Sequence, residues 1–168
     1  CLQSVLTQTL KEIEVICVDD GSMDCSLKIL QNYVKRDNRI WIYQQENLGA
    51  GRARNNALKK AKGEFVSFMD ADDWYPYENT LESLYSVAVN NNVMIAGGSI
   101  ASVNSDGKWS QNYNERLSGN CFLKDGIQNY RDYQYDYGYQ RFIYNRKMLV
   151  EFGIQFPDYK RYQDPPFF

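Results

Sequence analysis

The chain contains no histidine, so neither a catalytic base nor a metal ligand in it is an imidazole. It has no apolar run long enough to span a membrane and no signal-peptide pattern. Its 19 Lys and Arg residues are outnumbered by 21 Asp and Glu residues, and they form no basic cluster. The formal charge of −2 therefore argues against a nucleic acid as partner.

Cysteine is also scarce, and no pair has the CxxC spacing of a zinc or redox site. Cys17 lies inside an apolar run, where a free thiol packs as a small hydrophobic group, and Cys1, Cys25 and Cys121 are scattered. This usage fits a reducing compartment, and we expect a cytoplasmic protein.

What the chain does contain is enough apolar material for one core. With 168 residues, 43% apolar and 15% aromatic, it is too short for two comfortable cores. We therefore expect residues 1–168 to form a single domain.

Segments with strand character alternate with segments of helical periodicity over the first hundred residues. The expected strands are 13–18, 40–43, 64–69 and 93–97. The expected helices lie within 2–10, 26–37, 50–62 and 76–92, the last opened by Pro76. Such alternation requires crossover connections, so it predicts an α/β fold with a mainly parallel sheet and helices on both faces.

The pattern changes after residue 98. "NSDG" at 104–107 predicts a turn between two short strand-like pieces, and tyrosines crowd residues 127–144. These rings either shape a binding site for sugars or simply cover the sheet with a loop and a short strand. The second interpretation is favoured, and we assign no site residue there.

Polar clusters follow three of the expected strands: "DDGSMD", "QQENLGAG" and "DADDW". Each alone reads as a solvated loop with helix-capping residues. In open α/β sheets, however, ligands bind where the carboxyl ends of strands converge. The three carboxylates of "DADDW" repel one another unless a cation is present, and Mg²⁺ or Mn²⁺ prefers oxygen ligands. The clusters together predict a site for a metal-bound nucleotide diphosphate.

Three long segments resemble family 2 glycosyltransferases of the GT-A fold. They read "QSVLTQTLKEIEVICVDDGSMDCSLKIL", "ENLGAGRARNNALKKAKGEFVSFMDADDWY" and "FGIQFPDYKRYQDPPFF". The DDGS turn, the N-x-G-x-x-x-A-R-N helix entry, the D-x-D-D strand end and the late D-x-x-F occur in the family's order. The resemblance is nearest to bacterial enzymes that build capsule, lipopolysaccharide or exopolysaccharide.

The resemblance implies a role for seven residues. Asp20 would hydrogen-bond the base with Asp19 beside it, Asn47 and Arg54 would line the nucleotide pocket, and Asp70 would lie at the ribose. Asp72 would coordinate Mn²⁺ or Mg²⁺ on the diphosphate, and Asp164 would be the catalytic base. Residues 1–98 would then form the nucleotide-binding half and residues 99–168 the acceptor half.

The implied reaction moves a sugar, hexosyltransferase-like, from a nucleotide-sugar donor, by family habit a UDP-sugar, to a hydroxyl of a glycan or lipid-linked acceptor. Family members invert the anomeric carbon by direct displacement. The charge on the leaving diphosphate calls for a cation, and the acceptor hydroxyl calls for a base. Any association with the inner face of the plasma membrane would be peripheral, through parts outside this chain.

The sequence departs from the family pattern in three places. It begins after the usual first strand with its P-x-Y-N-like end, and it stops just past D-x-x-F, where members continue into acceptor-binding helices. Gln163 also replaces the Glu that often precedes the base. We therefore interpret the chain as a fragment that lacks the first strand.

Two alternatives stay open on the residues alone. "GAGRAR" at 49–54 begins like a dinucleotide-binding fingerprint, with Asp70 at the spacing of a ribose-binding acid, although Arg54 stands where that fingerprint has Gly or Ala. The other is a non-catalytic, degenerate domain that binds sugar nucleotides.

Replacing Asp164 with Asn separates a catalytic base from a helix cap, because Asn caps a helix but takes up no proton. We expect Asp164→Asn to preserve melting temperature and donor binding while lowering transfer by on the order of a hundredfold or more. Near-normal turnover, measured in the whole protein, would place the base elsewhere.

Overall fold

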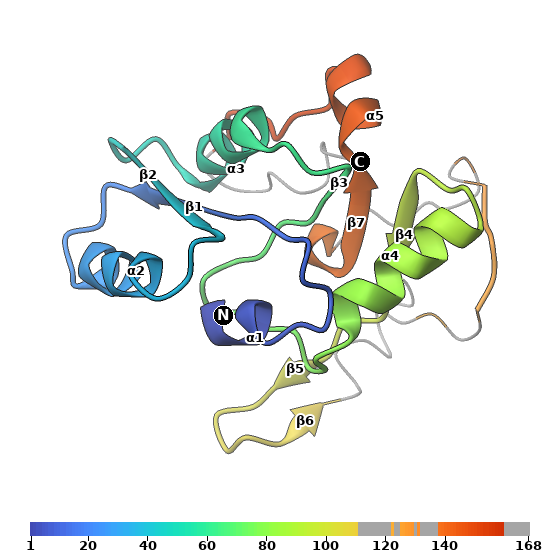
Figure 1. Ribbon diagram of the computed structural model, residues 1–168, viewed down its shortest axis with the longest axis horizontal. Coiled ribbons are helices and arrows are strands. Elements are labelled where there is room, and N and C mark those ends of the chain that lie inside the picture. Colours follow the sequence, from blue (N-terminus) through green and yellow to red (C-terminus); the bar gives the residue numbers. More distant parts are fainter. Residues whose placement is uncertain (111–121, 123–124, 130, 132–137, 160–168) are drawn as a thin grey trace.

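The computed structural model describes residues 1–110, 122, 125–129, 131 and 138–159 (Figure 1). The elements of the first half are α1 (Leu2–Leu6), β1 (Val15–Asp20), α2 (Ser26–Val34), β2 (Ile40–Gln45), α3 (Ala50–Lys60), β3 (Phe65–Val66), α4 (Thr80–Asn90) and β4 (Ile95–Gly97). They are followed by β5 (Ser102–Val103), β6 (Trp109–Ser110), the 3₁₀ turn η2 (Tyr139–Arg141), β7 (Phe142–Asn145) and α5 (Arg146–Glu151). Asp164 lies outside the described residues, as do residues 130 and 132–137 of the tyrosine-rich segment.

The first two strands form the expected parallel pair. β1 and β2 are aligned from Val15 opposite Ile40 to Asp20 opposite Gln45. Figure 1 shows α2 and α3 on opposite sides of this pair. Burial raises the pKa of the Cys17 thiol in β1 to about 11, which keeps it protonated, as expected for a packing residue. The α/β class is confirmed.

The second sheet has the order β3–β7–β4 and differs from the expected one. We expected the strands near 64–69 and 93–97 to continue a mainly parallel sheet, but each pairs antiparallel with β7. Phe142, Ile143 and Tyr144 of β7 are all buried, so this strand is covered on both faces. A short strand with such residues stabilises the sheet most when it lies in the centre.

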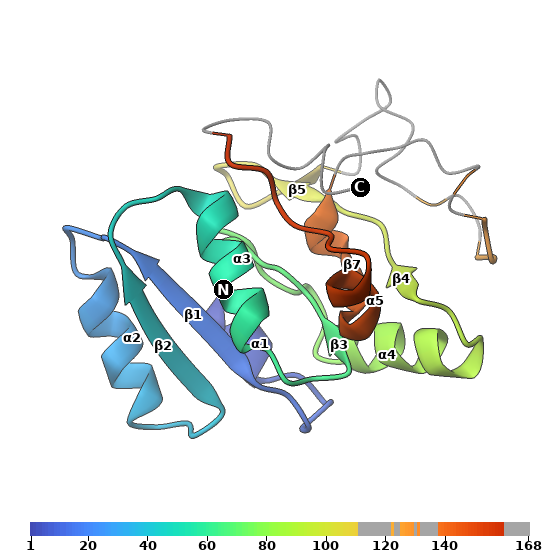
Figure 2. The same cartoon turned by 90° about the horizontal axis from the view of Figure 1, so that it is seen from above.

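Two core clusters lie on the two faces of this sheet. Phe142 and Tyr144 pack with Phe68, Leu58 of α3 and Leu149 of α5. Ile143, which points the other way, packs with Ala96 and with Ala88 of α4. Figure 2 shows α4 and α5 beside β7 from a second direction. The later part of the chain thus joins α3 to the sheet.

Several element ends also differ from expectation. The strand expected at 64–69 forms strand hydrogen bonds only at Phe65–Val66 (β3). The helix expected at 76–92 (α4) starts at Thr80 instead of Pro76. The buried Gln8 accounts for the later start: its side chain donates to the carbonyl of Tyr77 and accepts from the backbone N–H of Leu81. These bonds satisfy the backbone of the first turn of α4 from outside the helix.

The "NSDG" turn is confirmed, since it joins the antiparallel strands β5 and β6. Among the described residues, no helix combines the length and apolar character needed to cross a membrane.

Gly97 provides a test of the β4–β7 packing, because a Cβ there would overlap the ring of Phe142. We expect Gly97→Ala to lower the free energy of unfolding by about 1–3 kcal/mol, as overpacking does. The neighbouring Gly98→Ala is the matched control, since no atom lies within 4 Å of the added Cβ. Equal denaturant midpoints for the two variants would contradict this packing.

Candidate functional site

Asp20, at the end of β1, holds the loop that leads into α3. One carboxylate oxygen accepts from the Gln45 side chain at 2.7 Å and from the backbone N–H of Leu48 at 2.8 Å. The other accepts from the backbone N–H of Gly49 at 2.9 Å. A carboxylate offers about four acceptor positions, so Asp20 retains about one for a ligand.

Asp19 and Asn47 flank this carboxylate along the chain. Asp19 is only 7% exposed, and within the described part of the chain its carboxylate accepts no hydrogen bond. Asn47 is exposed, and its backbone lies against the turn at Gly21. Gly21 has φ +73°, and a Cβ there would lie 2.9 Å from the Asn47 nitrogen. Only glycine therefore lets the loops after β1 and β2 meet this closely.

Arg54 of α3 reaches the turn that follows β3. Its Nη2 donates to Oδ1 of Asp70 at 2.6 Å, in a pair whose side chains are 15% and 34% exposed. The guanidinium also stacks over the ring of Tyr139, 4.6 Å from its centroid, and over Phe156. The hydroxyl of Tyr139 lies 2.9 Å from each Asp70 oxygen. One helix thus joins the loop held by Asp20 to the acidic turn.

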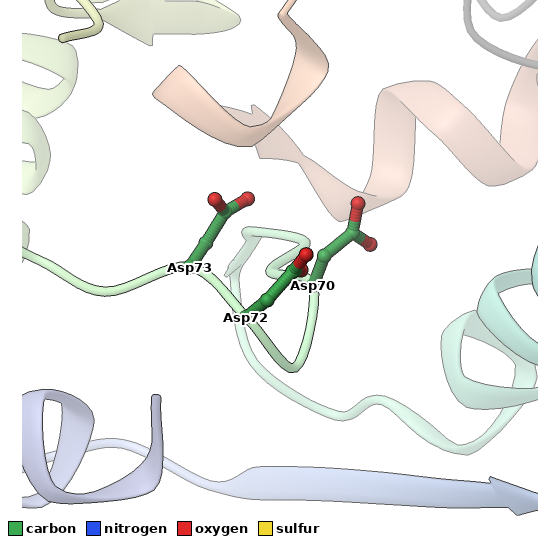
Figure 3. A group of neighbouring side chains, drawn as sticks. All are labelled: Asp70, Asp72 and Asp73. Atoms are coloured by element: carbon green, nitrogen blue, oxygen red, sulfur yellow. The ribbon is translucent and has the colours of Figure 1, made fainter. Parts of the chain in front are cut away.

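Three carboxylates project from that acidic turn (Figure 3). Oxygen atoms of Asp70, Asp72 and Asp73 all lie within 4.8 Å of one another. The turn is closed by a backbone hydrogen bond from Asp73 N–H to the Asp70 carbonyl. Asp72 is exposed and the other two are half-buried, so the cluster opens to solvent on one side.

The acidic turn carries excess negative charge that a cation would offset. The pKa of Asp73 is raised above its ordinary 3.8, first by partial burial and then by the charges of Asp70 and Asp72. Arg54 contacts Asp70 alone among the three. An oxygen-only, crowded and partly open set fits Mg²⁺ or Mn²⁺, which bind a few carboxylates and keep open positions.

The segment before Asp164 is fastened to α3. The Asn55 amide donates to the Phe156 carbonyl at 2.8 Å and accepts from its backbone N–H at 2.9 Å. One turn away, Arg52 pairs with Asp158 through two contacts. Asp164 itself lies outside the described residues, so its role stays a prediction.

Sequence reasoning missed three members of this arrangement. Asp73 was grouped with the acidic cluster but given no role, although its position in D-x-D-D was a sufficient signal. Asn55 lies next to Arg54 in the A-R-N motif, yet nothing in its spacing points to Phe156, about a hundred residues later. Tyr139 was one of many tyrosines in its segment, and no local pattern singled it out.

Comparisons with known proteins agree on one family. The family model described as Glycosyl transferase family 2 matches residues 1–153. The glycosyltransferase GlyA of Streptococcus pneumoniae serotype 4 is 38% identical over 133 residues, which are 76% of this chain and 19% of that protein. The glycosyltransferase EpsJ of Bacillus subtilis is 30% identical over 171 residues, covering 99% of this chain and 49% of that protein.

A solved structure resembles the whole chain. Residues 1–349 of TarS from S. aureus, in complex with UDP-GlcNAc, align with a TM-score of 0.82 and 28% sequence identity. The alignment covers 99% of this chain and 46% of that one. The chain thus spans less than half the length of each of these three proteins.

Asp73→Asn tests the charge crowding in the acidic turn. Because the pKa of Asp73 is raised in the folded state, its ionised form costs stability at pH 7. Without divalent cations, we expect Asp73→Asn to raise the melting temperature slightly, by on the order of 1–2 °C after solvent screening. The gain should shrink as pH falls and vanish below 3.8, the ordinary pKa, where Asp73 is protonated in both states.

Asp106→Asn, on the β5–β6 turn, is the matched control and should show no such gain. A lower melting temperature for Asp73→Asn in EDTA at pH 7 would mean that its carboxylate stabilises the turn instead.

Proposed function

Because the chain belongs to glycosyl transferase family 2, we propose that it transfers a sugar from a UDP-sugar to a hydroxyl of a glycan or lipid-linked acceptor, with inversion at the anomeric carbon. The family and the GT-A fold expected from the sequence are confirmed. The observation that carries the proposal is the Arg54–Asp70 pair, which brings the acidic turn against the helix whose entry loop Asp20 holds. A nucleotide diphosphate needs both features, one for the base and one for the phosphates.

In this proposal, the nucleotide binds to side chains that lie around the first turns of α3. Asp20 accepts an N–H of the base with its remaining acceptor position, and Asp19 lies beside it. Asn47 and Arg54 line the pocket, and Asp70 accepts from the ribose hydroxyls. The likeness to TarS, which was solved with UDP-GlcNAc, supports a uridine nucleotide as the donor.

Asp72, with Asp73 next to it, would hold the divalent cation. When bound, Mn²⁺ or Mg²⁺ neutralises the charge that builds on the leaving diphosphate. Asp70 is already engaged by Arg54, so the exposed Asp72 and the half-buried Asp73 are the carboxylates best able to turn toward a cation. In the metal-free protein these two carboxylates repel each other. A cation would relieve this repulsion, which contributes to the affinity of the site for the cation.

Asp164 would accept the proton of the acceptor hydroxyl as the hydroxyl oxygen attacks the anomeric carbon. Asn55 supports this assignment because it anchors Phe156, from which the chain continues to Asp164. Bond formation, departure of the nucleotide diphosphate and proton uptake then complete one displacement with inversion. A cytoplasmic location and peripheral membrane association remain predictions.

The dinucleotide-binding alternative receives no support from the site. Its fingerprint needs a small sixth residue for close approach of helix and strand. Here that residue is Arg54, whose side chain crosses to Asp70.

The experiment is UDP binding by calorimetry on the whole protein, in Mn²⁺ and then in EDTA. We expect UDP to bind at least about tenfold more tightly with Mn²⁺, because a cation held by Asp72 would offset the negative charge of the diphosphate. Asp72→Asn should abolish this difference while leaving the melting temperature in EDTA unchanged. Asp106→Asn, the same change at an exposed turn, should retain it. Equal UDP affinity in Mn²⁺ and EDTA would overturn the metal assignment.

A further inference from the structure

We propose that Tyr139 is a positioning residue of the donor site, whose hydroxyl holds the Asp70 carboxylate in the orientation that meets the nucleotide. This inference rests on the proposed function, since Asp70 is its ribose-binding residue. Tyr139 belongs to the later half of the chain, 69 residues from Asp70 in sequence.

The position of Tyr139 is determined by the core and does not depend on Asp70. The residue is fully buried, and its ring makes edge contacts with Phe68 and Phe156, with centroids 6.3 and 5.2 Å away. Because the ring is packed on several sides, its orientation is restricted, and in this orientation the hydroxyl points at Asp70.

The two donors to Asp70 contact its carboxylate in different ways. Arg54 donates to Oδ1 at 2.6 Å, whereas the Tyr139 hydroxyl lies 2.9 Å from Oδ1 and from Oδ2. Among the described residues, Tyr139 provides the only hydrogen bond to Oδ2. A single contact at Oδ1 lets the carboxylate pivot, and a second donor that bridges both oxygens stops this rotation.

The bridging geometry still leaves Asp70 able to bind a ligand. Its side chain is 34% exposed, and a carboxylate has about four acceptor positions, of which these two donors occupy only part. The Asp70 carboxylate projects on the same side of the turn as those of Asp72 and Asp73 (Figure 3). A hydroxyl pair such as that of a ribose is the ligand that a fixed, ionised carboxylate accepts best.

The orientation also matters for the neighbouring carboxylates. Asp72 and Asp73 carry the same charge as Asp70, and oxygen atoms of all three lie within 4.8 Å of one another, so they repel Asp70. Without the Tyr139 hydroxyl, this repulsion and the pull of Arg54 would rotate Asp70 away from the nucleotide. Tyr139 therefore acts through Asp70 and touches neither the sugar nor the phosphates.

Tyr139→Phe removes the hydroxyl and keeps the ring contacts with Phe68, Phe156 and Arg54. Measured by calorimetry on the whole protein with Mn²⁺, we expect UDP to bind about tenfold more weakly, the effect of losing a hydrogen bond to a charged group. With a UDP-sugar donor, the donor KM should rise by a similar factor while kcat changes much less, because ground-state binding is lost.

Tyr144→Phe is the matched control. It deletes a hydroxyl of the same kind from the same core, five residues away, and this hydroxyl donates to a backbone carbonyl instead of to Asp70. We expect its melting temperature to fall about as much as that of Tyr139→Phe, and its UDP affinity to stay within about twofold of wild type.

A double-mutant cycle with Asp70→Asn completes the test. If the hydroxyl acts through the Asp70 carboxylate, adding Tyr139→Phe to Asp70→Asn should cause little further loss of UDP affinity. Unchanged UDP binding in Tyr139→Phe, equal loss in both tyrosine variants, or additive losses in the cycle would each overturn the role of Tyr139. Wild-type protein that binds no UDP with Mn²⁺ would instead overturn the proposed function, and this inference with it.

Discussion

The contact between Arg54 and Asp70 is the interaction on which the rest of the site depends. The acidic turn crowds three carboxylates together, and partial burial and the charges of Asp70 and Asp72 both raise the free energy of ionised Asp73. The guanidinium offsets one of these charges at 2.6 Å and stacks on Tyr139, so it is held by geometry as well as charge. Because Arg54 projects from the second turn of α3, the position of this helix determines where the acidic turn can lie.

α3 is held in place by contacts with residues from early and from late in the sequence. At its start, Asp20 of β1 accepts the backbone N–H groups of Leu48 and Gly49, which fixes the entry loop. Along its length, Asn55 forms two hydrogen bonds with the backbone of Phe156, and Leu58 packs into the core beneath β7. Loops after β1, after β3 and after α5 therefore meet at one helix. A change that moves α3 would therefore displace the contacts to all three loops together.

β7 explains how two halves of the sequence form one site. Phe142 and Tyr144 fill one face of the sheet and Ile143 fills the other, so the strand lies between β3 and β4. η2 directly precedes β7 in the chain, so the position of β7 also determines where η2 lies. Tyr139 then reaches Asp70, and its hydroxyl links residues that the division at residue 98 would separate. Of this late segment, Phe142 and Tyr144 pack in the core, and the hydroxyl of Tyr139 reaches Asp70.

The sequence by itself determined the class of the fold, the family and the acidic turn. These depend on local patterns: alternating strand and helix periods produce β1, β2 and α3, and residues adjacent in the chain, such as Asp70 and Asp72, are necessarily adjacent in space. Only the tertiary structure decided that β7 enters the sheet antiparallel, that Asn55 anchors Phe156 and that Tyr139 holds Asp70. These contacts join residues about 70 to 100 positions apart. Their partners are chosen by packing on both faces of a strand, and short-range periodicity carries no information about that choice.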